Sequence, residues 1–264
     1  YYWSLMQKGR SLAQNIDALF FAPQGLLHYE FRELYDSLFR NSDKYIDVVS
    51  ILGKKLGGMR REEIVSGLGI ADNGNLSRIL EDLEHCGFIV RTNAYGARKY
   101  NAIYRLMDNF SLFFLKFMQE NKTDDPSFWS HNYTSPLRYS WCGLAFERVC
   151  FQHIPQIKHF LGIDQIHTEY YSWRSKVSKP AAQIDLLIER ADNLVNLCEI
   201  KYSQMPYTIT KEEDMRIRNR MADFVAETGI KSGIIPTMIT TFGVRLTQYA
   251  ALAQVQITMD DLFT

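Results

Sequence analysis

Apolar side chains recur every three or four residues in the first part of the chain, which is the spacing of one face of a helix. Six segments carry this pattern and are predicted to be helices: residues 12–20, 31–38, 45–52, 59–65, 76–83 and 110–118. Pro23, Gln24 and Gly25 separate the first two segments. Residues 1–40 are therefore expected to form a small helical segment of their own.

The composition changes from helical to strand-like after Gly87. Residues 88–91 are strand formers, residues 93–97 have turn chemistry, and residues 98–106 can return as a second strand. Helices followed by such a ribbon are the order found in a winged helix. We place this winged helix at residues 41–120.

A polar break that contains Pro126 covers residues 121–127 and predicts a domain boundary. Beyond it, helices are expected over residues 143–160 and 211–228, and five segments have strand composition: residues 166–173, 182–189, 194–202, 231–240 and 254–259. Strands that precede a helical crossover predict a mixed sheet in residues 125–264. The expected fold class is α+β and α/β.

Charge and motifs narrow the function. The 30 basic and 30 acidic side chains cancel, so any nucleic-acid site has to be a local patch. No G-x-x-x-x-G-K-[ST] loop occurs, and ATP has no site in these residues. The absence of a leader pattern and of any run of about 18 apolar residues predicts a cytoplasmic protein without a membrane partner. The four cysteines form no CxxC pair and are expected to be reduced core thiols.

Two charged positions interrupt otherwise apolar strands. Asp185 lies among apolar neighbours in one strand, and Glu199 and Lys201 lie on either side of Ile200 in the next. Because side chains alternate along a strand, Glu199 and Lys201 share a face, and Asp185 shares one with Gln183. A short turn at residues 192–193 would make the strands adjacent and antiparallel. Both carboxylates and the lysine are then expected to meet at one edge of the sheet.

Two carboxylates brought together repel unless a cation lies between them. A hard divalent ion, Mg²⁺ or Mn²⁺, prefers oxygen ligands and can activate a water molecule for attack on phosphorus. The metal set predicted here is Asp185, Glu199, Ile200 and Glu147, with Glu147 holding a metal-bound water and Lys201 orienting the attacking water. The alternative is an ordinary ion pair, because E-x-K is a common triplet on strands. A buried charge needs a partner, so a tight salt bridge from Lys201 would also account for it.

Three segments resemble a known family: Gln183-Ile184-Asp185-Leu186-Leu187-Ile188, Asn196-Leu197-Cys198-Glu199-Ile200-Lys201-Tyr202 and Gly143-Leu144-Ala145-Phe146-Glu147. They look like the PD-(D/E)XK nuclease-like domain that ends a group of prokaryotic AAA-type ATPases of the archaeal-ATPase-like group. The segments at residues 238–243 and 259–263 are similar to that group as well. The resemblance implies that residues 1–40 are the remnant of the ATPase lid and that a P-loop domain precedes Tyr1. It also gives Asp185, Glu199, Lys201 and Glu147 the catalytic and metal positions.

Two further sets of residues are candidates for contacts with nucleic acid. Asn75 and Arg78 in the third helix of the winged helix, with Arg98 and Lys99 in the wing, could bind DNA, although acidic residues share that helix. A structural or protein-contact role is the alternative. Trp173, Arg174 and Gln183 are candidates for substrate binding next to Asp185. For Trp173 and Arg174, core packing and a solvated loop are the alternatives.

Two functions follow from these observations. The first is a metal-dependent phosphodiesterase acting on nucleic acid under the control of an ATPase domain. The second is a non-catalytic module that uses the same fold to bind nucleic acid or protein within an ATPase complex. Self-association as a homo-oligomer is left open.

Overall fold

The structure is a computed structural model that describes residues 2–93, 95–96, 102–119, 124–175, 177 and 182–264. The chain divides into two compact units. Unit 1 comprises Tyr1–Arg91 and Ile103–Ser140, and unit 2 comprises Thr92–Ala102 and Trp141–Thr264. The residues expected to form the lid remnant and most of the expected winged helix thus belong to one compact body.

Unit 1 is built mainly from helices. Its elements are η1 (Tyr2–Leu5), α1 (Leu12–Ile16), η2 (Asp17–Phe21), α2 (Glu30–Leu38), α3 (Ser42–Lys54), β1 (Met59–Arg60), α4 (Arg61–Leu68), α5 (Gly74–His85), β2 (Ile89–Asn93), β3 (Ala102–Leu106), α6 (Asn109–Phe113), η3 (Phe114–Met118) and α7 (Phe128–His131). Each of the six predicted helices is present. Residues 59–60, expected at the start of a helix, instead form a short strand that pairs with β3.

Local chemistry accounts for the limits of α5. Asn73 is the N-cap, and its side-chain oxygen accepts hydrogen bonds from the backbone N–H groups of Asn75 and Leu76. The helix buries a stripe at spacings of three and four residues, as predicted: Leu76, Ile79, Leu80 and Leu83. The three strands form a sheet in the order β1-β3-β2. Helices α3, α4 and α5 together with this small sheet agree with the α+β class expected for these residues.

An aromatic core joins α2 to the helix after β3. The rings of Phe31 and Phe114 are stacked with centroids 4.1 Å apart. Tyr35 is fully buried, and its hydroxyl lies 2.9 Å from the hydroxyl of Ser111, which satisfies the polar end of the ring. Residues 1–40 are therefore held by burial of aromatic side chains.

Unit 2 is a five-stranded sheet covered by helices. Its elements are the part of α8 (Pro136–Gln152) from Trp141 onward, α9 (Ile154–Phe160), β4 (Thr168–Arg174), β5 (Gln183–Arg190), β6 (Leu194–Lys201), α10 (Lys211–Thr228), β7 (Gly233–Thr240), η4 (Ala250–Leu252), β8 (Val255–Thr258) and η5 (Asp260–Leu262). The strand order is β4-β5-β6-β7-β8. Strands β4, β5 and β6 are antiparallel, and β7 and β8 run parallel to β6. The predicted mixed sheet is confirmed.

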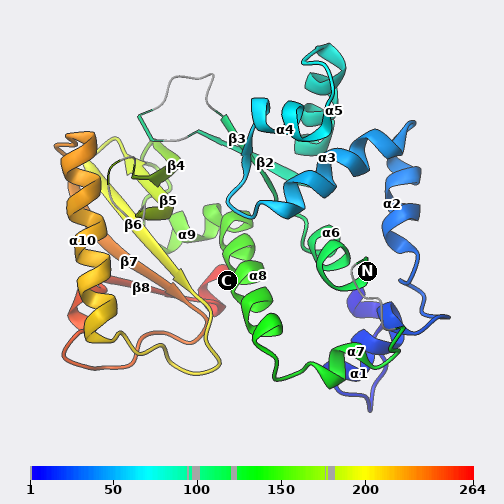
Figure 1. Cartoon of the computed structure of the whole chain (residues 1–264). Helices are drawn as coiled ribbons and strands as arrows, with labels where there is room; N and C mark the ends of the chain where they lie inside the picture. The colour runs from blue at the N-terminus through cyan, green and yellow to red at the C-terminus, as the bar shows by residue number, and fades with distance from the viewer. Residues whose placement is uncertain (1, 94, 97–101, 120–123, 176, 178–181) are drawn as a thin grey trace. The chain divides into compact units, whose positions relative to one another are not determined.

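The sheet has a helix layer on each side (Figure 1). On one side, α8 and α9 pack on the α8-face cluster, which includes Phe146, Cys150, Leu186 and Cys198. On the other side, α10 packs on the α10-face cluster: Trp173, Ile184, Leu187, Val195, Leu197 and Phe224. Burial on both faces explains why β5 and β6 are apolar almost throughout.

Several local expectations can be compared with the structure. The turn between β5 and β6 lies at the predicted residues, with Asn193 in the left-handed region at φ 63°. The helix expected over residues 143–160 is divided at His153, and Pro155 follows in the first turn of α9. Cys150 and Cys198 are buried thiols as expected, whereas Cys142 is only half-buried and Cys86, at the C-cap of α5, is exposed. Among the described residues, no helix is long and apolar enough to cross a membrane.

Candidate functional site

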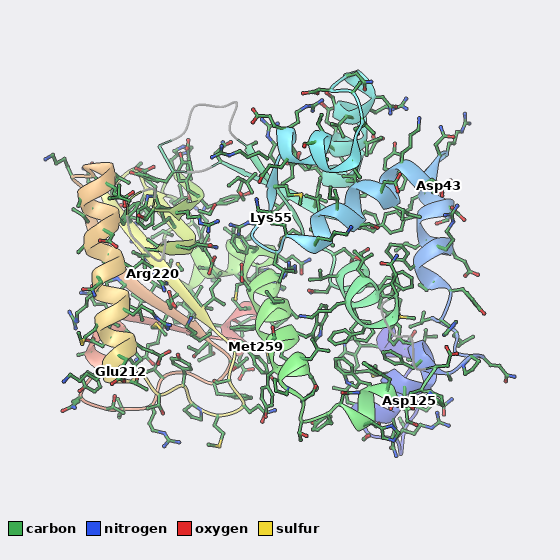
Figure 2. All side chains as sticks on the ribbon, in the orientation of Figure 1. Asp43, Lys55, Asp125, Glu212, Arg220 and Met259 are labelled. Atoms are coloured by element: carbon green, nitrogen blue, oxygen red, sulfur yellow. The ribbon has the colours of Figure 1, made fainter. Side chains whose placement is uncertain are left out.

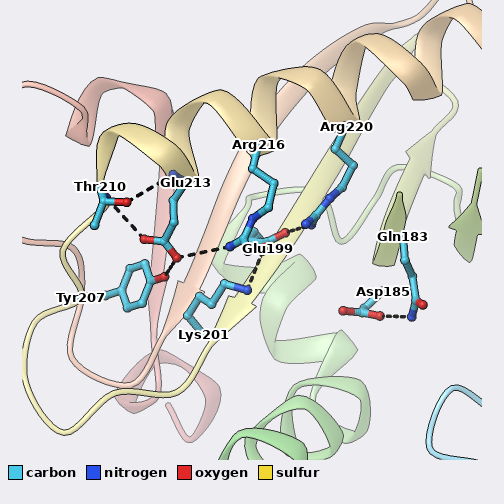
Figure 3. Close-up of polar contacts among 9 residues, drawn as sticks. All are labelled: Gln183, Asp185, Glu199, Lys201, Tyr207, Thr210, Glu213, Arg216 and Arg220. Atoms are coloured by element: carbon cyan, nitrogen blue, oxygen red, sulfur yellow. Dashed lines mark hydrogen bonds and ion pairs between the residues drawn. The ribbon is translucent and has the colours of Figure 1, made fainter. Parts of the chain in front are cut away.

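The C-terminal end of β6 carries a buried carboxylate between two cations. Glu199 is 5% exposed. Its Oε1 atom lies 2.6 Å from Nζ of Lys201, and its Oε2 atom accepts a hydrogen bond from Nη1 of Arg220 (Figure 3). Glu199 and Lys201 therefore share a face of the sheet, as predicted, while Ile200 packs on the α8-face cluster.

Asp185 occupies the N-terminal end of the neighbouring strand, β5. Its Oδ1 atom accepts a hydrogen bond of 2.6 Å from Nε2 of Gln183. Within the part of the chain that the structure describes, no hydrogen bond or ion pair joins Asp185 to Glu199 or Lys201. Figure 3 shows the Asp185–Gln183 pair apart from the contacts around Glu199.

A β-bulge explains this separation. Tyr171 pairs with Leu187 and Trp173 pairs with Ile184, so Asp185 and Leu186 together lie opposite the single residue Ser172. The extra residue places both Ile184 and Leu187 in the α10-face cluster. Ile184 faces α10, and adjacent side chains on a strand point to opposite faces. Asp185 therefore points to the face covered by α8, whereas Glu199 points to α10.

The expected meeting of both carboxylates and the lysine at one edge of the sheet does not occur in this structure, because alternation along β5 is not regular and Asp185 and Glu199 point to opposite faces. The two residues are nevertheless close in the sheet topology. The β5–β6 pairing ends at Leu186 and Cys198, so Asp185 and Glu199 are the first residues beyond the last pair.

Glu147 lies on α8, two residues beyond Ala145 and next to Phe146, which packs on the α8-face cluster. Its negative charge contributes to the raised pKa of the Cys150 thiol, after burial and the adjacent Cys198. Glu147 is thus on the side of the sheet opposite to Glu199. The four predicted residues are brought to the same region of unit 2 but not to one face.

A second set of polar contacts continues from Glu199 along α10. Glu213 lies 3.3 Å from Arg216 and accepts a hydrogen bond from the hydroxyl of Tyr207. Burial and the Glu213 carboxylate raise the pKa of Tyr207, so this hydroxyl stays protonated and donates. Glu213 also forms the capping box of α10 with Thr210. These contacts fix the first two turns of α10 against the loop that follows β6.

The donor set does not fit a divalent metal in this arrangement. Both oxygens of Glu199 are engaged by cations, and Asp185 faces the other side of the sheet. In the described residues, no group of three or more His, Cys, Asp or Glu side chains could hold a metal ion. Ile200 offers only a backbone carbonyl as an oxygen ligand. The roles of these residues with a metal stay predictions.

The candidate substrate-binding residues have different environments. Trp173 is 6% exposed and packs edge-on against Phe224, so its ring belongs to the core and offers no face to a base. Arg174 is exposed at the end of β4 and pairs in register with Gln183. Of the three, Arg174 is the one whose charge is accessible to a ligand.

The candidate DNA contacts in unit 1 lie at a hollow in its surface. Asn75 and Arg78 are exposed on α5 and line this hollow together with Arg40 and Lys44. Arg40 and Lys44 were not identified from the sequence, because they lie outside the expected recognition helix. Asp82 lines the same hollow and reduces its positive charge. Arg98 and Lys99 lie outside the described residues.

The residue that sequence reasoning missed in unit 2 is Arg220. It lies about halfway along α10, whose first turn carries Glu212 (Figure 2). One sequence signal was present: Arg220 is three residues after Ile217 and four before Phe224, both buried. This spacing places Arg220 on the face of the helix that packs on the sheet.

Comparisons of this chain with models of protein families, with known proteins and with solved structures found no match.

Proposed function

We propose that this chain is the C-terminal part of a AAA-type ATPase and that unit 2 is a nuclease-like domain that binds the phosphodiester backbone of nucleic acid. One observation carries the proposal: the buried Glu199 held between Lys201 and Arg220 at the end of β6. A buried charge in a sheet is costly, and buried charges with a specific partner cluster at functional sites. The P-loop domain and the lid assignment of residues 1–40 are part of the same proposal.

Accessible cations near this carboxylate support a role in binding phosphate. Lys201 has a side chain that is 29% exposed, and the side chain of Arg216 is 54% exposed. Cations of this kind contact phosphate oxygens without regard to base sequence. The hollow beside Arg78, Arg40 and Lys44 in unit 1 is a second basic surface of the type that contacts nucleic acid. We propose that it is the DNA-contact surface of a winged helix.

The geometry favours binding over metal-dependent cleavage. Glu199 is neutralised by two side-chain cations and does not need a metal to be stable. Asp185 is turned away from it and is engaged by Gln183. Lys201 and Arg220 hold Glu199 in place, and Lys201 retains N–H donors for an anionic ligand.

A Mg²⁺- or Mn²⁺-dependent phosphodiesterase is the second candidate, and one observation favours it. Strands β5 and β6 cease to pair at the level of Asp185 and Glu199, so the two acidic residues flank the point where the strands part. Cleavage would require Asp185 to change face and Arg220 to release Glu199. Binding requires neither movement, so experiments can distinguish the two candidates.

Binding of fluorescently labelled single- and double-stranded DNA and RNA to the full chain tests the proposal. Lys201→Met and Arg78→Met are expected to weaken binding and to lower the slope of log affinity against log salt by about one charge each. Arg218→Met also removes one positive charge, at an exposed position on α10, and serves as the control. Absence of salt-dependent binding would refute the proposal. Cleavage that requires Mn²⁺ and is lost in Asp185→Ala would establish the second candidate in its place.

A further inference from the structure

Each carboxylate oxygen of Glu199 contacts one cationic side chain of this protein. The arrangement therefore resembles a cation-binding site that is already filled. Lys201 reaches Oε1 from the same strand, and Arg220 reaches Oε2 from α10, as Figure 3 shows. The Glu199 side chain is 7% exposed and that of Arg220 is 15% exposed. Because both groups are largely removed from water, neither is compensated by solvent to the extent that a surface pair would be.

The packing of α10 holds Arg220 in this position. Ile217 and Phe224, on either side of it along the same helix face, are both buried against the sheet. Arg218 differs: its side chain is 60% exposed and pairs with Asp214 of its own helix. The buried neighbours therefore hold the backbone of Arg220 on the helix face that packs against the sheet, beside Glu199.

A divalent ion that approached Glu199 would meet two positive charges already in contact with the carboxylate. Like charges in contact repel strongly at the effective dielectric constant of a partly buried site, which is roughly 20. The ion would also have to give up part of its hydration shell, which Mg²⁺ does reluctantly. Neither cost is offset by Asp185, which points to the other face.

We propose that Arg220 is the resident cation of the Glu199 site and takes the position that a divalent metal would otherwise fill. The site is consequently indifferent to Mg²⁺ and Mn²⁺ in the native protein, and removing the guanidinium opens Oε2 of Glu199 to a divalent cation while Lys201 stays on Oε1. This inference is independent of nucleic-acid binding, because its readouts are metal affinity and metal-dependent stability in the absence of any ligand.

Metal titration of four proteins tests the inference. The wild-type chain, Arg220→Ala, Arg220→Lys and Arg218→Ala are titrated with Mn²⁺ by electron paramagnetic resonance, and their melting temperatures are recorded with Mn²⁺, Mg²⁺ or chelator. Only Arg220→Ala is expected to bind Mn²⁺ at least about tenfold more tightly than wild type and to recover part of its lost melting temperature in a saturable way. Arg220→Lys keeps the charge and is expected to behave as wild type.

Glu199→Gln placed on Arg220→Ala locates the ion, because it is expected to abolish the gain in Mn²⁺ affinity. Saturable binding by the wild-type chain that is lost in Glu199→Gln would overturn the inference. A folded Arg220→Ala protein that ignores both metals would overturn it as well. If Arg220→Ala does not fold, Arg220→Gln removes the charge with less loss of volume and takes its place in the same comparison.

Discussion

Removing Arg220 should destabilise unit 2 far more than removing another arginine two residues away on the same helix. Arg220→Met deletes the charge and retains most of the aliphatic volume, so its main effect is to leave Glu199 with one partner. Loss of one member of a buried ion pair costs about 3–5 kcal/mol when the other is left uncompensated. Lys201 remains 2.6 Å from Glu199 and compensates part of the charge. We therefore expect a loss of about 2–3 kcal/mol in the free energy of opening of β6.

The matched control is Arg218→Met. The Arg218 side chain is 60% exposed and its partner Asp214 lies one turn away, so the pair is of the surface type. Such pairs contribute about 0.2–1 kcal/mol. The two variants differ from wild type by the same atoms and the same charge, and they differ from each other only in what the guanidinium contacts.

Hydrogen exchange of β5, β6 and α10, followed by mass spectrometry, measures the opening of these elements separately from unit 1. A double-mutant cycle with Glu199→Gln isolates the interaction and should give a coupling of about 1–3 kcal/mol. Equal effects of Arg220→Met and Arg218→Met would refute the reasoning, because they would show that burial adds nothing to the pair. A coupling near zero would do the same.

Three further predictions concern other described residues. Burial, with the charge of a nearby carboxylate, raises the pKa of Tyr95 from 10.0 to about 12. The folded state therefore holds this proton more tightly, and its contribution to stability is present below pH 10 and lost between pH 10 and 12. Between pH 10 and 12 the melting temperature should fall less steeply with pH for Tyr95→Phe than for wild type, and equal slopes would contradict the assignment. Native protein should show a fast thiol reaction that disappears in Cys86→Ser, whereas Cys198, buried and with its pKa raised to about 12, should react only after unfolding. Gly58→Ala should lower the melting temperature clearly more than Gly57→Ala, because Gly58 has φ +84° and a Cβ there would lie 2.5 Å from a side chain of β3, while a Cβ at Gly57 meets nothing within 4 Å.

The sequence predicts best those elements whose ends are set by local chemistry. The predicted bounds of the helix at residues 211–228 agree with α10. Thr210 and Glu213 form a capping box at its start, and Gly229 adopts a left-handed conformation after its last residue. The β5–β6 turn was predicted for the same reason, because Asn193 tolerates a positive φ.

Contacts between distant segments were outside the reach of sequence patterns. Arg220 is 21 residues from Glu199, and the ion pair depends on how α10 lies across the sheet. The spacing of Ile217 and Phe224 is a signal for the buried face of α10, but it does not indicate which strand position each side chain meets. The E-x-K pair was predictable because both residues belong to one strand, where alternation fixes their common face.

The position of Asp185 shows how one irregular residue can decide the chemistry of a site. Regular alternation along β5 would put Asp185 on the face of Leu187, which is the α10 face that Glu199 also occupies. The bulge places two residues, Asp185 and Leu186, opposite Ser172. The residues of β5 before the bulge therefore point to the faces opposite to those that regular alternation would give them. Nothing in the composition of residues 183–188 distinguishes a bulged strand from a regular one, since both bury the same apolar side chains on two covered faces. The predicted pair of acidic residues was therefore identified correctly as neighbours in the sheet, while the face of Asp185 was set by pairing with β4. With Asp185 on the α8 face, Glu199 is left to be balanced by Lys201 and Arg220 alone, and this favours a site in which side-chain cations take the place of a metal.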